Sequence, residues 1–131
     1  MITLEPTADG SNTLYVPELN EHYHSVKGAL TESAHIFIQM GLNHAQAANP
    51  RVLEIGFGTG LNAFLTLLEA EKSQRAIHFT SIERFPLSED IVRELAYPET
   101  IAPEECEKFY ALHTASWNQK VKISPYFTLH K

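Results

Sequence analysis

The sequence has very little cysteine and no long apolar segment. Cys106 is the only cysteine in 131 residues, so no internal disulfide can form and a disulfide-rich secreted scaffold is excluded. No apolar run approaches the roughly 18 residues that a membrane-spanning helix needs. The first ten residues lack the basic and apolar regions of a signal peptide. We therefore expect one cytoplasmic domain that makes no membrane contact.

Positive charge is also scarce. Ten lysines and arginines stand against sixteen acidic residues, which gives a formal net charge of −6. This balance excludes a strongly cationic nucleic-acid binder as a description of the whole chain. The charge is uneven, because four lysines and no acid follow Glu107. Four spaced lysines make a weak patch, and we interpret them as part of a solvated strand and loop.

The histidines and the cysteine do not form a recognised metal or nucleophile pattern. His22 and His24 would share one face of a strand, but no cysteine or carboxylate completes a metal-ligand spacing beside them. Cys106 and His113 lie two turns apart on one predicted helix, too far for a nucleophile–base pair. We predict no metal site.

The order of elements predicts an α/β fold. Residues 1–20 favour an N-terminal β-hairpin, with a turn at Asp9-Gly10. A helix is expected over 30–48, with the Thr31 hydroxyl as its cap, and it should end at Asn49-Pro50. Residues 51–131 then alternate between apolar strands and amphipathic helices, which predicts a parallel sheet with flanking helices. The expected strands are 51–55, 76–82, 121–124 and 126–130, and the expected helices are 61–72, 86–96 and 103–113.

A glycine-rich turn joins the first of these strands to its helix. Gly56, Gly58 and Gly60 follow the apolar strand directly, and an amphipathic helix starts at Leu61. Glycines in such a turn allow positive φ and let a ligand approach the backbone, while the amides of the helix face that ligand. Glu83 ends the next strand, 23 residues after Gly60, where a carboxylate can accept hydrogen bonds from ribose hydroxyls.

The spacing of the glycines departs from the dinucleotide pattern. In Gly-x-Gly-x-x-Gly the third glycine would fall on Leu61, but here it comes one residue earlier, at Gly60. An acid on the preceding strand, Glu54, followed by Gly-x-Gly-x-Gly instead resembles motif I of class I S-adenosylmethionine-dependent methyltransferases. A strand-to-helix turn that binds no ligand is the simplest alternative.

A closer resemblance covers the chain from about Thr7 to its end. Residues 54–62 (EIGFGTGLN) and 81–87 (SIERFPL) resemble the MnmC-type methyltransferase family, and residues 22–25, 28–32 and 36–38 are similar to the segment before motif I in that family. This family makes 5-methylaminomethyl-2-thiouridine at the wobble position of tRNA. The resemblance implies a partial Rossmann-like class I methyltransferase fold.

The resemblance also implies which residues form the site. S-adenosylmethionine is the implied cofactor and tRNA the implied partner of the full enzyme. Tyr23 and Ser25 are candidates to close over the cofactor or the target base. The implied cofactor-binding residues are Glu54, Gly56, Phe57, Gly58, Gly60, Asn62, Glu83 and Arg84.

Family members continue beyond the point that matches Lys131. The acid near the adenine and the Asp-Ala-Phe-x-Pro-type motif of the family have no counterpart here, so we expect the catalytic residue to lie after Lys131 and this chain to be inactive alone. We interpret residues 51–131 as the first half of the Rossmann-like sheet. Strand 51–55 would then have a bare edge, which favours self-association through that edge.

Two other functions fit the same residues. The first is a different S-adenosylmethionine-dependent transferase with a small-molecule substrate. The second is a non-catalytic nucleotide-binding or interaction module.

Overall fold

The N-terminal part forms a small antiparallel sheet. The computed structural model describes all residues from Met1 to Lys131. Strands β1 (Thr3–Pro6), β2 (Asn12–Val16) and β3 (Glu21–His22) lie in the order β1-β2-β3. The expected hairpin is thus confirmed, and β3 extends it. This third strand is only two residues long, and its sequence carries no alternation by which it could have been predicted.

A second, four-stranded sheet contains the rest of the strands. Its order is β4 (Arg51–Ile55), β5 (Ile77–Ile82), β7 (Phe127–His130) and β6 (Lys120–Ser124). Strands β4, β5 and β7 are parallel, and β6 is antiparallel to β7. The sheet is therefore mixed at one edge, because a short turn joins β6 to β7 and a turn of that length allows only antiparallel pairing.

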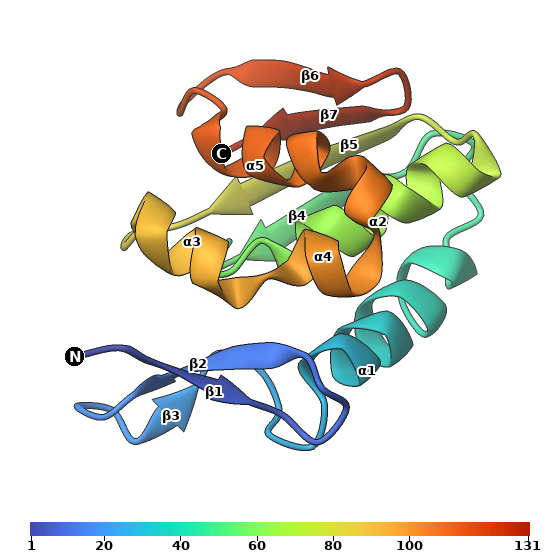
Figure 1. The fold of residues 1–131 in the computed structure, drawn as a ribbon. Coiled ribbons are helices and arrows are strands. Elements are labelled where there is room, and N and C mark those ends of the chain that lie inside the picture. The colour runs from blue at the N-terminus through green and yellow to red at the C-terminus, as the bar shows by residue number, and fades with distance from the viewer.

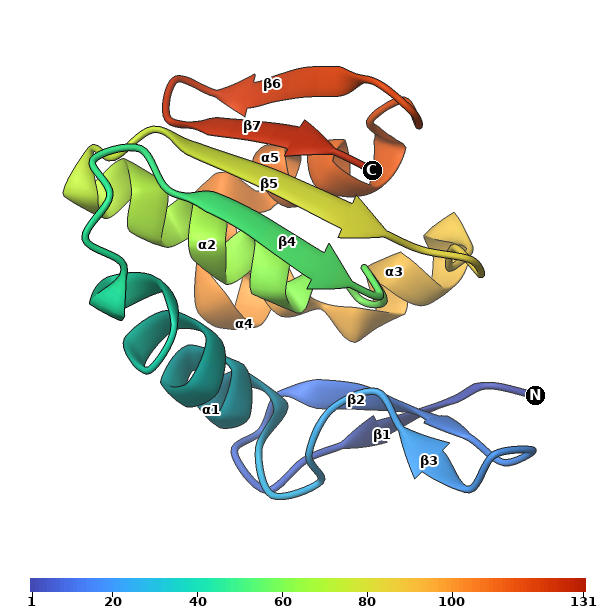
Figure 2. The same cartoon turned by 180° about the vertical axis from the view of Figure 1, so that it is seen from behind.

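The helices cover one face of this sheet. Helix α2 (Leu61–Ser73), α3 (Glu89–Leu95), α4 (Tyr97–Ile101), the short η3 (Pro103–Glu105) and α5 (Cys106–Thr114) lie on the same side (Figure 1). Figure 2 shows the opposite face without a helix over it. Burial alternates accordingly along β5, where Ile77, Phe79 and Ser81 are buried and their neighbours are not.

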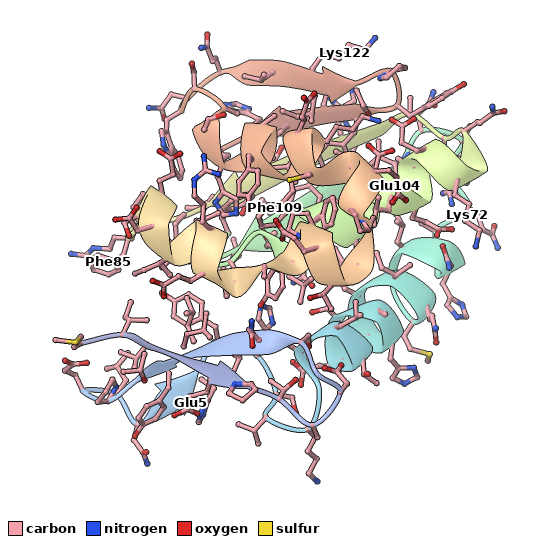
Figure 3. The ribbon with its side chains drawn as sticks, viewed as in Figure 1. Glu5, Lys72, Phe85, Glu104, Phe109 and Lys122 are labelled. Atoms are coloured by element: carbon pink, nitrogen blue, oxygen red, sulfur yellow. The ribbon has the colours of Figure 1, made fainter.

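The core lies between the sheet and these helices. Phe109 of α5 is fully buried (Figure 3) and packs edge-to-face on Phe64 of α2, with 5.1 Å between ring centroids. Tyr97 is also fully buried and donates a 2.7 Å hydrogen bond to the carbonyl of Asn12. Asn12 in turn donates to the carbonyl of Leu95. These bonds attach the N-terminal sheet to the helical layer.

The helix expected over 30–48 is shorter and less regular than the sequence indicated. Helix α1 (Ala29–Ser33) continues as a π-helical segment, η1 (Ala34–Gln39), and a separate 3₁₀ turn, η2 (Leu42–His44), follows. The helical structure is interrupted between these two segments at Gly41. A Cβ on this residue would lie 2.7 Å from the carbonyl oxygen of Phe37. The apolar residues do recur at helical spacing. The backbone, however, changes from α-helical to π-helical hydrogen bonding and then to a 3₁₀ turn.

The start of α1 is capped from outside the helix. Its first three amides donate to side chains of the β1–β2 turn: Ala29 to Thr7, Leu30 to Ser11, and Thr31 to Asp9. The Thr31 hydroxyl also donates to Asp9, so it does not cap the helix as the sequence suggested. The hairpin turn therefore serves as the N-terminal cap of α1.

Strand β4 forms an open edge of the larger sheet. Only β5 pairs with it, and no strand lies on its other side. Leu53 and Ile55 on this strand are 65% and 75% exposed. An exposed apolar edge strand presents unpaired backbone groups to other chains.

No helix in the structure combines the length and the apolar character that crossing a membrane would require.

Replacing Asp9 by alanine tests the cap of α1. Hydrogen bonds from Ser11 and Thr31 lower the pKa of Asp9 below its ordinary value, although burial by itself raises it. The stabilisation is therefore complete above the unfolded pKa of about 3.9 and is lost as pH falls below it. We expect Asp9→Ala to lower the free energy of unfolding by about 1 kcal/mol at pH 7 and by less at pH 3, measured with urea. Glu94→Ala is the control, and equal unfolding curves at pH 7 would contradict the cap.

The open edge of β4 leads to a prediction about association. We expect the chain to self-associate as its concentration rises and Leu53→Lys to reduce this association, because a lysine on an edge strand opposes pairing. Sedimentation velocity over a concentration series measures it. Leu19→Lys changes an equally exposed leucine away from the edge and serves as the control. A wild-type chain that stays monomeric at high concentration would refute the prediction.

Candidate functional site

The glycine turn between β4 and α2 has the left-handed backbone that its sequence predicts. Gly56, Gly58 and Gly60 have φ angles of 91°, 55° and 76°. A Cβ on Gly60 would also lie 2.7 Å from Nε2 of His113, whereas a Cβ on Gly56 would meet nothing within 4 Å. Gly60 is therefore required by conformation and by space, and Gly56 leaves room for a ligand against the backbone.

Glu83 holds the outer side of this turn. Its Oε2 accepts a 2.8 Å hydrogen bond from the amide of Gly58, and its Oε1 accepts a 2.9 Å bond from the amide of Phe85. The parallel register of β4 and β5 aligns Ile55 with Ile82, so Glu83 directly follows the strand end beside the turn. The structure thus brings together Glu83 and the glycines, as the sequence predicted.

Glu54 lies on the inner side of the turn and is 7% exposed. The hydroxyl of Ser81 donates to its Oε1 at 2.8 Å, and the amide of Asn62 donates to its Oε2 at 3.1 Å. Burial raises the pKa of Glu54 to about 7, the two hydrogen bonds oppose that rise, and the nearby Glu83 carboxylate adds to it. No lysine or arginine pairs with this carboxyl group.

A cavity of about 440 Å³ opens at the carboxyl end of β4. Glu54, Gly56, Phe57, Gly58 and Asn62 line it, all of them predicted from the sequence. The side-chain oxygen Oδ1 of Asn62 is buried and has no hydrogen-bond partner. The cavity is lined by the carboxyl groups of Glu32 and Glu54 and by no lysine or arginine, so it suits a ligand with positively charged and hydrogen-bonding groups.

The segment after β3 forms another wall of the cavity. The ring of Tyr23 lies over the turn, since a Cβ on Gly58 would be 3.3 Å from its Cδ2. Burial and the Glu83 carboxylate raise the pKa of Tyr23. Ser25, the other candidate for closure, accepts a hydrogen bond from the amide of Lys27 and does not line this cavity.

Arg84 lies away from the cavity. Its guanidinium carbon is 5.2 Å from the ring centroid of Phe85, and both side chains are exposed. Figure 3 shows Phe85 at the periphery of the molecule. Arg84 is therefore adjacent to the site in sequence without lining it.

Three residues at the turn were not predicted as site residues. Thr59 is buried, its hydroxyl lies 2.7 Å from Nε2 of His24, and its carbonyl lies 2.9 Å from Nε2 of His113. Burial lowers the pKa of His113 to about 4 and also lowers that of His24. These histidines are distant in sequence, so no local spacing pointed to them. No cluster of three or more potential metal ligands is present.

The chain is similar in sequence to proteins named for tRNA modification. The tRNA 5-methylaminomethyl-2-thiouridine biosynthesis bifunctional protein MnmC of Delftia acidovorans is 44% identical over 89 residues, which are 63% of this chain and 14% of that protein. The protein of the same name from Polaromonas naphthalenivorans is 40% identical over 104 residues, which are 72% of this chain and 16% of that protein. No protein-family model matches the chain.

A solved structure agrees with this likeness. The crystal structure of MnmC2 from Aquifex aeolicus has a TM-score of 0.62 and 25% sequence identity to this chain, and the match covers 99% of this chain and 41% of that chain. The match thus spans less than half of the solved relative and only 14% and 16% of the two curated relatives just described.

The raised pKa of Glu54 predicts how stability depends on pH. A carboxyl group with a raised folded pKa stabilises the fold below its unfolded pKa of about 4.3 and loses that contribution as pH rises through about 7. We expect Glu54→Gln to gain on the order of 2 kcal/mol relative to wild type between pH 4.5 and pH 8, measured by urea unfolding. Glu94→Gln, at an exposed acid, is the control. A difference in unfolding free energy between Glu54→Gln and wild type that stays constant with pH would contradict the prediction.

Proposed function

Since this chain is related in sequence and fold to the MnmC proteins, we propose that it is the S-adenosylmethionine-binding part of a cytoplasmic tRNA methyltransferase. The proposed reaction converts the 5-aminomethyl group of a wobble uridine to 5-methylaminomethyl. The observation that carries the proposal is the glycine turn with one carboxylate on each side, Glu54 and Glu83, at the carboxyl ends of β4 and β5.

The donor set fits S-adenosylmethionine in its charge. The cofactor supplies a methyl group on a positively charged sulfonium and carries an ammonium group and a ribose diol. Glu83 would accept hydrogen bonds from the ribose hydroxyls, in exchange for the bond it now accepts from Gly58. Glu54 would face the cationic amino acid part of the cofactor, and the free oxygen of Asn62 would accept a hydrogen bond there.

The same residues suit a dinucleotide less well. A pyrophosphate needs helix amides and usually a basic side chain, and no lysine or arginine lines the cavity. Two buried or half-buried carboxylates beside the turn would repel its negative charge. The lining of the cavity therefore supports a cationic cofactor.

The remaining residues would position the cofactor. Gly56 and Gly58 would let the cofactor lie against the backbone, and Phe57 and Tyr23 would exclude water from it. The fold would then contribute to the reaction rate by aligning the methyl group with an acceptor nitrogen. Because Glu54 and Glu83 are assigned to the cofactor, we assign no residue of this chain as the base that accepts the amine proton.

Calorimetric titration tests the cofactor class. We expect S-adenosylmethionine to bind the 131-residue chain at millimolar affinity or tighter and NADH not to bind. Glu83→Ala should weaken binding of S-adenosylmethionine by about tenfold or more, because it removes a charge-assisted acceptor. Glu94→Ala removes an exposed acid from α3 and should leave the affinity unchanged.

The other outcomes overturn specific parts of the proposal. Binding of NADH alone would show a dinucleotide site. Binding of neither ligand would refute cofactor binding by this chain and favour a non-catalytic module. Binding of S-adenosylmethionine together with methylation of a small amine, but not of a tRNA whose wobble uridine carries the 5-aminomethyl group, would indicate a small-molecule transferase.

A further inference from the structure

A side-chain hydrogen bond joins the glycine turn to the segment that follows the N-terminal sheet. We propose that His24 is a positioning residue of the cofactor site, whose hydrogen bond to Thr59 couples the order of the glycine turn to the order of the N-terminal sheet. The bond joins Nε2 of His24 and Oγ1 of Thr59 over 2.7 Å. The effect on cofactor binding rests on the proposed function of the turn, whereas the contact between His24 and Thr59 does not depend on a ligand.

The N-terminal sheet fixes the backbone of His24. The amide of His24 donates a 2.9 Å hydrogen bond to the hydroxyl of Thr13, a fully buried residue of β2. The amide of Tyr23 donates a 2.8 Å bond to the carbonyl of Leu14 on the same strand. Both residues that reach the turn are thus held by β2, so their side chains have a fixed origin.

Thr59 is held from three directions. Its hydroxyl accepts a 3.3 Å bond from the amide of Leu61 at the start of α2, besides its bond with His24. On the opposite side its carbonyl accepts a bond from Nε2 of His113 on α5. Thr59 is 1% exposed, so water cannot easily replace a lost partner, and breaking one of these bonds costs more than it would at the surface.

The state of His24 suits a bond to a neutral hydroxyl. Burial lowers the pKa of His24, and Glu32 opposes this effect more weakly. The imidazole is therefore neutral at pH 7 and can act as either donor or acceptor at Nε2. An amide side chain of similar reach retains that ability, which makes His24→Gln the conservative variant.

The contact lies beside that of Tyr23 with the turn. Tyr23 and His24 are adjacent, and the Tyr23 ring reaches the turn at Gly58 while the His24 ring reaches it at Thr59. Loosening His24 would free one of the two walls that the N-terminal segment gives to the cavity. We therefore expect the sheet and the turn to order together, with a ligand at the turn increasing protection of residues in the sheet.

Hydrogen exchange of the ligand-free chain tests the contact directly. We expect His24→Ala and Thr59→Val to reduce protection of the Gly58, Gly60 and Leu61 amides by about five- to tenfold, and His24→Gln and Thr59→Ser to keep it close to wild type. In the double variant the two losses should not add. Protection of the Phe79 and Leu129 amides in the core should stay unchanged, which separates a local effect from general destabilisation.

His22 offers a matched control. It precedes His24 by two residues and ends β3 of the N-terminal sheet, but its Nε2 bonds to Glu5 over 2.8 Å and it does not contact the turn. His22→Ala should therefore leave the amides of the turn protected. Equal loss of protection in His22→Ala and His24→Ala, or additive losses in the double variant, would overturn the proposal.

Titration with S-adenosylmethionine tests the consequence. We expect about three- to tenfold weaker binding in His24→Ala, near wild-type binding in His24→Gln, and increased protection of the Thr13 and Tyr23 amides in wild type when the cofactor is added. Unchanged affinity in His24→Ala would overturn the positioning role. A wild-type chain that binds no cofactor would refute the proposed function instead, while the ligand-free measurement would still decide whether the contact exists.

Discussion

The positive φ angles of Gly56, Gly58 and Gly60 are the constraint on which the site depends. These three glycines turn the chain from β4 into α2 within five residues, and their amides donate to Ile82, Glu83 and Phe57. Parallel pairing then sets what lies beside the bend, because the register of β4 with β5 puts Glu54 opposite Ser81 and brings Glu83 to the same edge. A substitution that straightened the turn would therefore move the Gly58 amide away from Glu83 and the Asn62 side chain away from Glu54.

The electrostatics of the site follow from this geometry. Strand β4 places Glu54 inside the protein, where only neutral donors meet it, and burial raises its pKa to about 7. Glu83 stays closer to solvent and satisfies the amide of Gly58. A cationic group between them would pair with the buried charge of Glu54 and would also offset the repulsion between the Glu54 and Glu83 carboxylates. The site is thus arranged to favour positive charge over phosphate.

Local sequence features predicted the parts of the structure that local physics determines. The positions of Gly56 to Gly60, the strands on either side of the site and the acid that follows the second strand each depend on a few consecutive residues, and the strand–turn–helix context was confirmed. The cap of α1 by Asp9 and the contacts of Thr59 with His24 and His113 join segments far apart in the chain. No spacing rule encodes them, because they exist only once the sheets have packed.

The same distinction explains the error in the helix expected over 30–48. The apolar repeat correctly marked a segment that packs on the core, but periodicity cannot show where the first amides find their acceptors. Those acceptors are Thr7, Asp9 and Ser11, in the turn between β1 and β2. The N-terminal sheet therefore supports the larger sheet twice, by starting α1 and by supplying Tyr23 and His24 to the glycine turn. Both supports come from side chains within 24 residues of the N-terminus. A shift in β2 would therefore move the start of α1 and also move Tyr23 and His24 at the cavity.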